Sequence, residues 1–151
     1  MSRGFSIVEL VIALVIIAIV ISLAVPVYIH YQQKSRIEND THRLYATVKE
    51  LQLKAKTLKK YYCFELKDSR TLYIVDSDNC SASGGWEVKF LTEYESNRNY
   101  FRINPLGVFN TYGNIHAIDG DGATVDCISI TTFRVCEGKW NEEEKKCYCV
   151  F

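Results

Sequence analysis

The chain has 151 residues, of which 48% are hydrophobic and 24% charged, with two prolines. This composition excludes wholesale disorder and fits about one folded domain. The formal net charge is zero, from 18 basic and 18 acidic side chains, so we do not expect a globally basic nucleic-acid-binding protein. The charge is uneven, because residues 34–60 hold eight basic and three acidic side chains, whereas residues 61–151 hold nine and fourteen.

The first predicted element is a long apolar helix. Residues 10–29 are twenty consecutive residues without a formal charge. At about 1.5 Å per residue, a helix of this length spans the hydrocarbon layer of a bilayer, roughly 30 Å. The run is longer than the apolar region of a cleaved signal peptide, about 7–15 residues, and no Ala-x-Ala-like site ends it. We therefore predict a membrane helix that the mature protein keeps.

Two residues do not fit a plain membrane anchor. Glu9 lies at the start of the run, where an ionised carboxylate is costly in lipid and usually has a purpose. Pro26 lies near its end and removes one helical hydrogen bond, which predicts a kink or a local loosening.

The segment from Gly4 to Leu10, with the sequence GFSIVEL, closely resembles the processing motif of type IV prepilins and type II secretion pseudopilins. The resemblance implies that a prepilin peptidase cuts between Gly4 and Phe5 and then methylates the new N-terminus on Phe5. It also implies three parts: a leader peptide of residues 1–4, a transmembrane and filament-core helix of residues 5–31, and a periplasmic globular domain of residues 32–151.

The same resemblance assigns roles to the two unusual residues and implies partners. Glu9 matches the glutamate at the fifth mature position, which pairs with the N-terminal amine of a neighbouring subunit during assembly, and Pro26 matches a proline common in the family's helix. The implied partners are the prepilin peptidase, other pilin or pseudopilin subunits and an inner-membrane assembly platform. The implied location is the bacterial inner membrane, crossed once with the C-terminal domain in the periplasm, and then a pilus or pseudopilus.

The helix is predicted to continue through residues 32–60 with an amphipathic pattern. Apolar or small residues recur at spacings of four and three, which places them on one stripe of a helix: Ile37, Thr41, Leu44, Val48, Leu51, Ala55 and Leu58. The stripe could form a coiled coil, but packing on the chain's own sheet is favoured, because Asn39 and Thr41 dilute the heptad and strands follow at once.

From residue 61 the apolar period changes to two, which predicts a β-rich region over residues 61–151. Glycine, asparagine, aspartate and proline turns separate eight expected strands: 61–66, 71–75, 86–91, 100–103, 115–118, 125–130, 133–137 and 147–150. The expected fold class is α+β, with a long N-terminal helix packed on an antiparallel β-sheet, as in the pilin fold.

Six cysteines follow the apolar run, and their even number predicts disulfides in an oxidising compartment: Cys63, Cys80, Cys127, Cys136, Cys147 and Cys149. Cys-x-x-Cys and zinc-type Cys/His spacings are absent from the sequence. We expect Cys63 to pair with Cys80. A Cys127–Cys136 bridge would leave the last two cysteines to join across a single residue, which strains the geometry. Cys136 is therefore expected to pair with Cys147 or Cys149, and Cys127 with the other.

Residues 123–138 resemble the final hairpin of the GspH/FimT group of minor pilins and pseudopilins, which cap or initiate filaments. In competence members of that group, a Gly-Arg-x-Arg element in the hairpin is implicated in DNA binding. Here the sequence TFRV at residues 132–135 stands in its place, with one arginine and no glycine. A DNA-binding minor pilin for DNA uptake is the alternative function, with Arg134 and Lys139 as possible DNA contacts.

No combination of nucleophile, base and orienting residue is visible, and no phosphate-binding loop occurs, so we expect neither an enzyme nor a cofactor. Asp119, Asp121 and Asp126 could surround a calcium ion, but their loop lacks the ligand spacing and terminal glutamate of an EF-hand. A glycine-rich turn whose aspartates bond their own backbone is the favoured interpretation, and calcium is a weak candidate.

Overall fold

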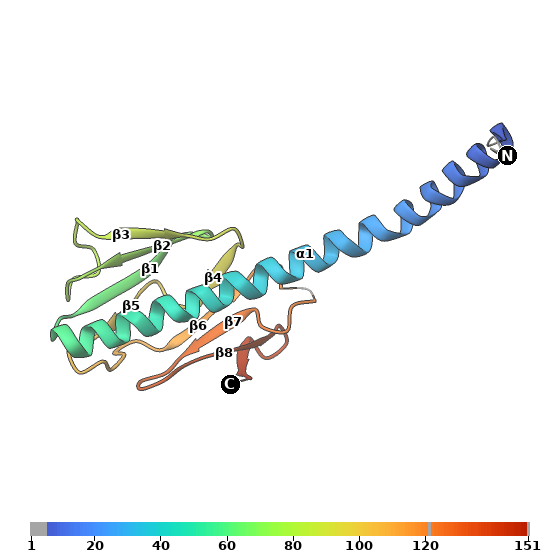
Figure 1. Cartoon of the computed structure of the whole chain (residues 1–151). Helices are drawn as coiled ribbons and strands as arrows, with labels where there is room; N and C mark the ends of the chain where they lie inside the picture. The colour runs from blue at the N-terminus through green and yellow to red at the C-terminus, as the bar shows by residue number, and fades with distance from the viewer. Residues whose placement is uncertain (1–5, 121, 151) are drawn as a thin grey trace. The chain divides into compact units, whose positions relative to one another are not determined.

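The computed structural model describes residues 6–120 and 122–150 (Figure 1). The chain divides into two compact units, Met1–Gln33 and Lys34–Phe151, which are described separately. The expected cleavage position between Gly4 and Phe5 lies outside the described residues.

The first unit consists of the N-terminal part of helix α1 (Ile7–Leu58). Every described residue of this unit is exposed, from the first turn of the helix to Gln33. An 18-residue window of the helix has a mean hydropathy of 3.2 and no buried residue, so its length and composition would allow it to cross a membrane. The helix continues through Pro26. Because proline has no backbone N–H, the Ser22 carbonyl four residues earlier lacks its helical donor there.

In the second unit, α1 turns one stripe of side chains toward two sheets. Six of the seven predicted stripe positions are buried, which confirms packing against the chain's own domain. Leu58 is the exception, since 57% of it is exposed at the end of the helix. Asp40 is also buried beside the stripe, although aspartates are mostly exposed in folded proteins.

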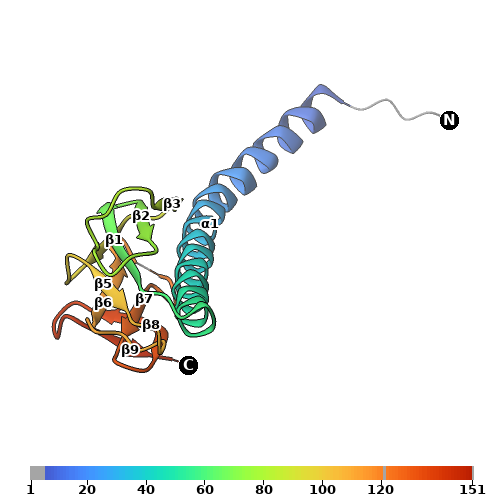
Figure 2. The ribbon, with the colours of Figure 1, turned by 90° about the vertical axis from the view of Figure 1, so that its left-hand side faces the viewer.

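Nine strands form two antiparallel sheets in the described residues, where a single sheet was expected. The first sheet has the order β3-β2-β1-β5, with strands β1 (Tyr62–Asp68), β2 (Thr71–Val75), β3 (Trp86–Lys89) and β5 (Phe101–Ile103). The second has the order β4-β6-β7-β8-β9, with strands β4 (Tyr94–Ser96), β6 (Gly113–Ala117), β7 (Cys127–Ile130), β8 (Val135–Asn141) and β9 (Lys146–Cys149). Figure 2 shows both sheets on the same side of the second half of α1.

Strand β4 was not predicted, and it changes the topology. It has three residues and comes directly after β3, but it pairs with β6 rather than with β3. The chain therefore passes from the first sheet to the second at residues 90–93, returns for β5 and crosses again to β6. The sequence of β4, YES, has one apolar side chain followed by two polar ones, so it shows no alternation from which sequence analysis could find a strand.

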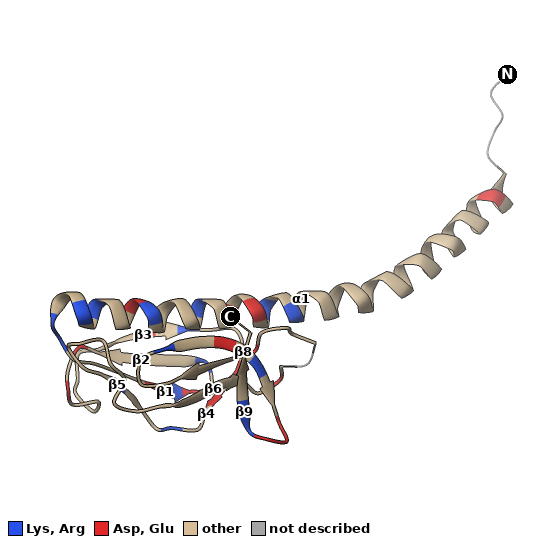
Figure 3. Ribbon diagram, turned by 90° about the horizontal axis from the view of Figure 1, so that it is seen from below, with Lys and Arg blue, Asp and Glu red and all other residues tan. Residues whose placement is uncertain are grey.

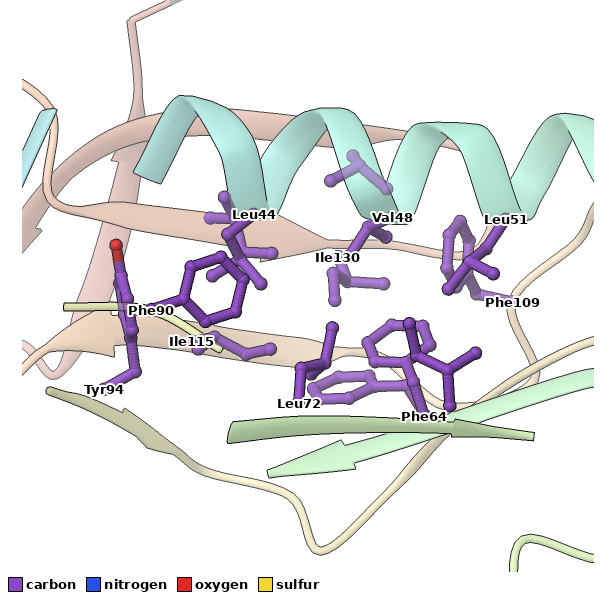
Figure 4. Packing of buried hydrophobic residues seen from close by; sticks show 14 of the residues in the cluster. Leu44, Val48, Leu51, Phe64, Leu72, Phe90, Tyr94, Phe109, Ile115 and Ile130 are labelled. Atoms are coloured by element: carbon purple, nitrogen blue, oxygen red, sulfur yellow. The ribbon is translucent and has the colours of Figure 1, made fainter. Parts of the chain in front are cut away.

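The core lies between α1 and the two sheets. Figure 4 shows Leu44, Val48 and Leu51 pointing from the helix toward Leu72 of the first sheet and Ile130 of the second. Leu44, Val48 and Leu72 are 0% exposed. Fully burying a side chain of this size contributes about 1.5–3 kcal/mol, so the helix stripe joins two sheets that share few strand contacts.

Two polar side chains of α1 tie the helix to the connection between the sheets. The carboxylate Oδ2 of Asp40 accepts hydrogen bonds from the backbone N–H groups of Leu91 and Thr92, each at 2.8 Å. The hydroxyls of Thr41 and Tyr94 lie 3.1 Å apart in the core. Burial raises the pKa of Tyr94 well above its usual value, so the phenol keeps its proton and can donate.

We expect Asp40→Ala to lower the free energy of unfolding by about 1–3 kcal/mol, because two backbone donors lose their acceptor. Urea unfolding of the full chain in detergent, followed by tryptophan fluorescence, measures the change. Asn39→Ala is the matched control, since Asn39 is exposed and bonds only Ser35 on the same helix. Equal stabilities of the two variants would contradict the role given to Asp40.

Candidate functional site

Of the processing motif, the structure describes Glu9 but neither Gly4 nor Phe5, which lie outside the described residues. Glu9 is exposed in the first turn of α1, and its backbone N–H donates to the Ser6 carbonyl at 3.0 Å. Glu9 follows Ser6 by three residues, which is the spacing of a capping box. A carboxylate at this end of a helix also interacts favourably with the helix dipole. Glu9 can therefore favour the helix start locally and still present its charge to a partner.

The surface around this carboxylate is apolar on every side of the helix. The large aliphatic residues from Ile7 to Ile29 are between 48% and 80% exposed. A helix with apolar residues on every face is buried in a membrane or among other helices, because packing one face against a single surface would leave the other faces in water. The chain supplies no cover for this surface within the first unit.

Asp126, one of the three calcium candidates, is bound by protein donors instead. Its Oδ2 accepts a hydrogen bond from the Lys139 ammonium at 2.5 Å, and its Oδ1 accepts one from the backbone N–H of Trp140 at 2.7 Å. Lys139 also donates to the Gly120 carbonyl at 2.9 Å. Asp126 is 2% exposed, so the ammonium neutralises a carboxylate that burial would otherwise penalise.

This arrangement lends the weak calcium hypothesis no support. A lysine ammonium occupies the position beside Asp126 that a cation would need, and both carboxylate oxygens are already used. Asp119 is exposed, and Asp121 lies outside the described residues. Within residues 6–120 and 122–150, no group of three or more metal-ligating side chains could hold a metal ion.

The two DNA-contact candidates are not brought together. Arg134 is exposed in the turn between β7 and β8, whereas Lys139 lies five residues along β8 with its ammonium bound to Asp126. Five residues of a strand span about 16 Å. Glu137, between them, accepts a hydrogen bond from His42 of α1 at 2.7 Å. Arg134 and Lys139 thus form no joint basic patch for a phosphate backbone.

The six cysteines form three disulfides in the second unit. Cys63 is joined to Cys80, Cys127 to Cys147, and Cys136 to Cys149. Of the two pairings that the sequence left open for the last four cysteines, the structure has the one with Cys136–Cys149. Each bridge closes a loop of 13–20 residues, for which the chain-entropy model gives about 3 kcal/mol.

Strand register and one glycine position these bridges. Ile130 pairs with Val135, so the turn has four residues and Cys127 lies opposite Gly138 rather than opposite Cys136. Gly138 in turn pairs with Cys149 on β9. The backbone carbonyl of Tyr148 lies where a Cβ at position 138 would be, so only glycine lets β9 approach this closely.

His116 and Trp140 stack on the outer side of the second sheet, with ring centroids 3.8 Å apart. Burial lowers the pKa of His116, although the charges of Glu95, Glu142 and Asp126 oppose that shift. The His116 Nδ1 and Trp140 Nε1 atoms are buried, and neither has a hydrogen-bond partner in the described part of the chain. The stack is therefore a neutral aromatic surface surrounded by carboxylates.

Sequence analysis missed three polar contacts of α1, two with loops and one with strand β8. The Gln52 amide donates to the carbonyls of Gly107 and Phe133, and the Glu38 carboxylate accepts from the backbone and hydroxyl of Thr124. Burial raises the pKa of Glu38, but the Thr124 hydrogen bonds outweigh it and hold the pKa below its usual value. The third contact is the His42–Glu137 bond. These residues looked like parts of a solvated helix face, and no local pattern distinguishes them.

Comparisons with known proteins find an N-terminal motif and solved structures of similar fold. Residues 1–25 match the family model described as the prokaryotic N-terminal methylation motif. A crystal structure of the type IV minor pilin FimU from Pseudomonas aeruginosa is similar with a TM-score of 0.58 and 13% identity, covering 72% of this chain and 92% of that one. A second crystal form of FimU gives a TM-score of 0.54 and 15% identity, covering 68% and 92%. A comparison with curated proteins finds no match.

We expect Lys139→Met to lower the free energy of unfolding by about 1–3 kcal/mol, because Asp126 loses its charged partner and the Gly120 carbonyl loses a donor. Thermal and urea unfolding of the full chain in detergent measure the change. Lys89→Met is the control, since Lys89 is an exposed lysine on a strand of the other sheet. If calcium restores the stability of Lys139→Met, the loop is a cation site after all; no effect of either variant would contradict the role of the ammonium.

Proposed function

We propose that this chain, which combines the N-terminal methylation motif with a type IV pilin-like fold, is a minor pilin or pseudopilin. In this proposal it is a structural subunit of a type IV pilus or a type II secretion filament. A prepilin peptidase removes residues 1–4 and methylates Phe5. Residues 5–31 then hold the subunit in the bacterial inner membrane, with residues 32–151 in the periplasm, until an inner-membrane platform draws it into the filament.

The observation that carries the proposal is the uncovered apolar surface of α1. Each large aliphatic side chain gains about 1.5–3 kcal/mol when it leaves water. The helix from Ile7 to Ile29 therefore needs an apolar environment throughout its life. Lipid supplies it before assembly and neighbouring helices supply it afterwards, so one segment can serve as anchor and as filament core.

Glu9 explains how such a helix could select one position among its neighbours. Cleavage after Gly4 creates an amine on Phe5, which is cationic below a pKa of about 7.7–8.0, and methylation keeps the charge. A carboxylate in apolar surroundings is tolerated only when it is paired. Glu9 of an incoming subunit would pair with the Phe5 amine of its neighbour, and any other register would leave both charges unpaired.

The DNA-binding alternative has less support. It depends on Arg134 and Lys139, which are separated along β8, and Lys139 is engaged with Asp126. The FimU likeness supports the filament function through the fold alone, because the identities are 13% and 15%.

We expect Gly4→Val to block processing, because a branched side chain at the scissile bond obstructs the peptidase. Intact-mass spectrometry of the membrane-inserted protein should find the wild-type chain beginning at a methylated Phe5 and the variant beginning at Met1. Ser2→Val makes a comparable change two residues earlier and should be processed. A wild-type protein that still begins at Met1 would remove the proposal.

Glu9→Gln should be processed normally but should enter filaments at least about a hundredfold less often, because the Phe5 amine of the neighbour loses its countercharge in an apolar site. Quantitative immunoblotting of sheared filaments against the membrane fraction measures incorporation. Ser22→Ala is the control on the same helix, since its hydroxyl bonds only the Ile19 carbonyl. Unchanged incorporation of Glu9→Gln would restrict Glu9 to a local role at the helix start.

A further inference from the structure

One surface of the second unit is an apolar groove with lysines at its rim. This basic groove has a volume of about 550 Å³ and is formed by α1, the loop after β5 and the turn between β7 and β8. Three large side chains in it are strongly exposed, namely Leu53 at 63%, Leu106 at 68% and Phe133 at 76%. Lys49 and Lys56 complete it, and its lining contains no acidic residue. Exposed apolar residues gathered in one place with a polar rim are typical of a protein interaction surface.

A second surface has the opposite charge. This acidic pocket has a volume of about 360 Å³, and Ile118, Asp119, Trp140 and Glu142 line it together with the Asp126–Lys139 pair. Glu95 lies near it, because Glu95 and Glu142 both act on His116, which stacks on Trp140. The pocket also offers apolar contact, since Ile118 is 50% exposed and the Trp140 indole lines it.

Two lysines of the groove and two glutamates near the pocket take part in no ion pair within the described residues. They are Lys49 and Lys56 of the groove, and Glu95 and Glu142 near the pocket. Figure 3 shows blue segments along the end of α1 that leads into β1, and red segments at the turn after β8.

The two surfaces lie at opposite ends of the second half of α1, so they cannot contact each other in one molecule. The loop beside the pocket is held at Glu38 through Thr124, whereas the groove is held at Gln52 through Gly107 and Phe133. Fourteen residues of helix separate these positions by about 21 Å. A second copy can bring its pocket to the groove of the first. Its own groove is then free for a third copy, because a head-to-tail contact joins different surfaces of its two partners.

We propose that the basic groove of one subunit receives the acidic pocket of a second copy of this chain in a head-to-tail contact. Phe133 and Leu53 meet Ile118 and the edge of Trp140, while Lys49 and Lys56 face Glu95 and Glu142. The contact rests on the proposed filament function. It would give the filament a polarity, because every subunit uses different surfaces toward its two neighbours along the assembly.

The test exchanges the charges in the full chain, purified in detergent. One variant carries Lys49→Glu and Lys56→Glu, and the other carries Glu95→Lys and Glu142→Lys. A carbodiimide links lysines directly to carboxylates in contact, and mixed isotope labels identify links between chains by mass spectrometry. We expect wild-type chains to link groove to pocket, and each variant alone to lose about tenfold in cross-linked dimer, since two charge pairs become repulsive.

Mixing the two variants should restore the dimer, because each repulsive surface then finds its complement on the other chain. Lys67→Glu with Lys89→Glu is the matched control, since it makes the same charge change on the first sheet and should leave the dimer unchanged. Loss of the dimer in the control, no loss in either variant, no rescue on mixing, or links from the groove only to another protein would each overturn the head-to-tail contact.

Failure of this contact is distinguishable from failure of the filament function. A chain that is cleaved at Gly4 and enters filaments, but shows no effect of the charge exchange, overturns the contact alone. A chain that still begins at Met1, but shows loss and rescue of the dimer, overturns the filament proposal and supports the contact between copies.

Discussion

The structure depends on one constraint, which is that the first twenty-odd residues of α1 are apolar on every side and find no cover in their own unit. A soluble helix buries one stripe and leaves the other face to water. Here every described residue from Ile7 to Gln33 is exposed, and the most apolar window has no buried residue. The free-energy cost of leaving this surface in water makes the segment dependent on lipid or on other helices. The proposed cycle of membrane insertion and filament entry provides both in turn.

In the second unit, the same helix is amphipathic and covers the two sheets. Beyond Lys34, the apolar residues narrow to one stripe, which covers two sheets that have no strand in common. Burial of apolar side chains between the helix and the sheets supplies most of the stabilisation. The hydrophobic effect has no preferred direction, so it does not by itself fix the position of each loop. Position is also defined by polar contacts, in which Asp40, Glu38 and Gln52 bind groups of the loops and His42 binds Glu137 of β8. The Asp40 bond from the Thr92 N–H is buried, and a buried donor without an acceptor costs about 1–3 kcal/mol, so Asp40 contributes most to fixing the loop that it binds.

The last three strands form a closely linked structure. Two disulfides join β9 to β7 and β8, and Gly138 allows the backbone of β9 to approach where a side chain would collide. The Lys139 ammonium joins Asp126 to the Gly120 carbonyl and holds the preceding loop against β8. The covalent and ionic links leave the outer face of the sheet, with His116 stacked on Trp140, as a stable surface. A surface that keeps its shape loses less entropy on binding, which favours contacts between subunits.

Local properties of the sequence determined the features that depend on neighbouring residues. An uncharged run of twenty residues predicts a membrane-length helix, spacings of four and three predict the buried stripe, and the GFSIVEL segment indicates the methylation motif that residues 1–25 match. The helix and eight of the nine strands in the described residues were located, because the pattern of each segment and its flanking turns is local.

Only the tertiary structure decided the features that join distant residues. It split the strands into two sheets through β4, whose sequence, YES, shows no apolar alternation. A four-residue turn set the register that places Cys127 opposite Gly138 and selected Cys136–Cys149, because a shift of one residue moves every side chain to the other face. It also placed the Lys139 ammonium in an ion pair with Asp126, so that this lysine binds a residue of its own chain rather than a ligand. These strand, disulfide and ion pairings depend on which chain segments the core brings together. The periodicity of a segment indicates its own secondary structure but not the segment with which it pairs.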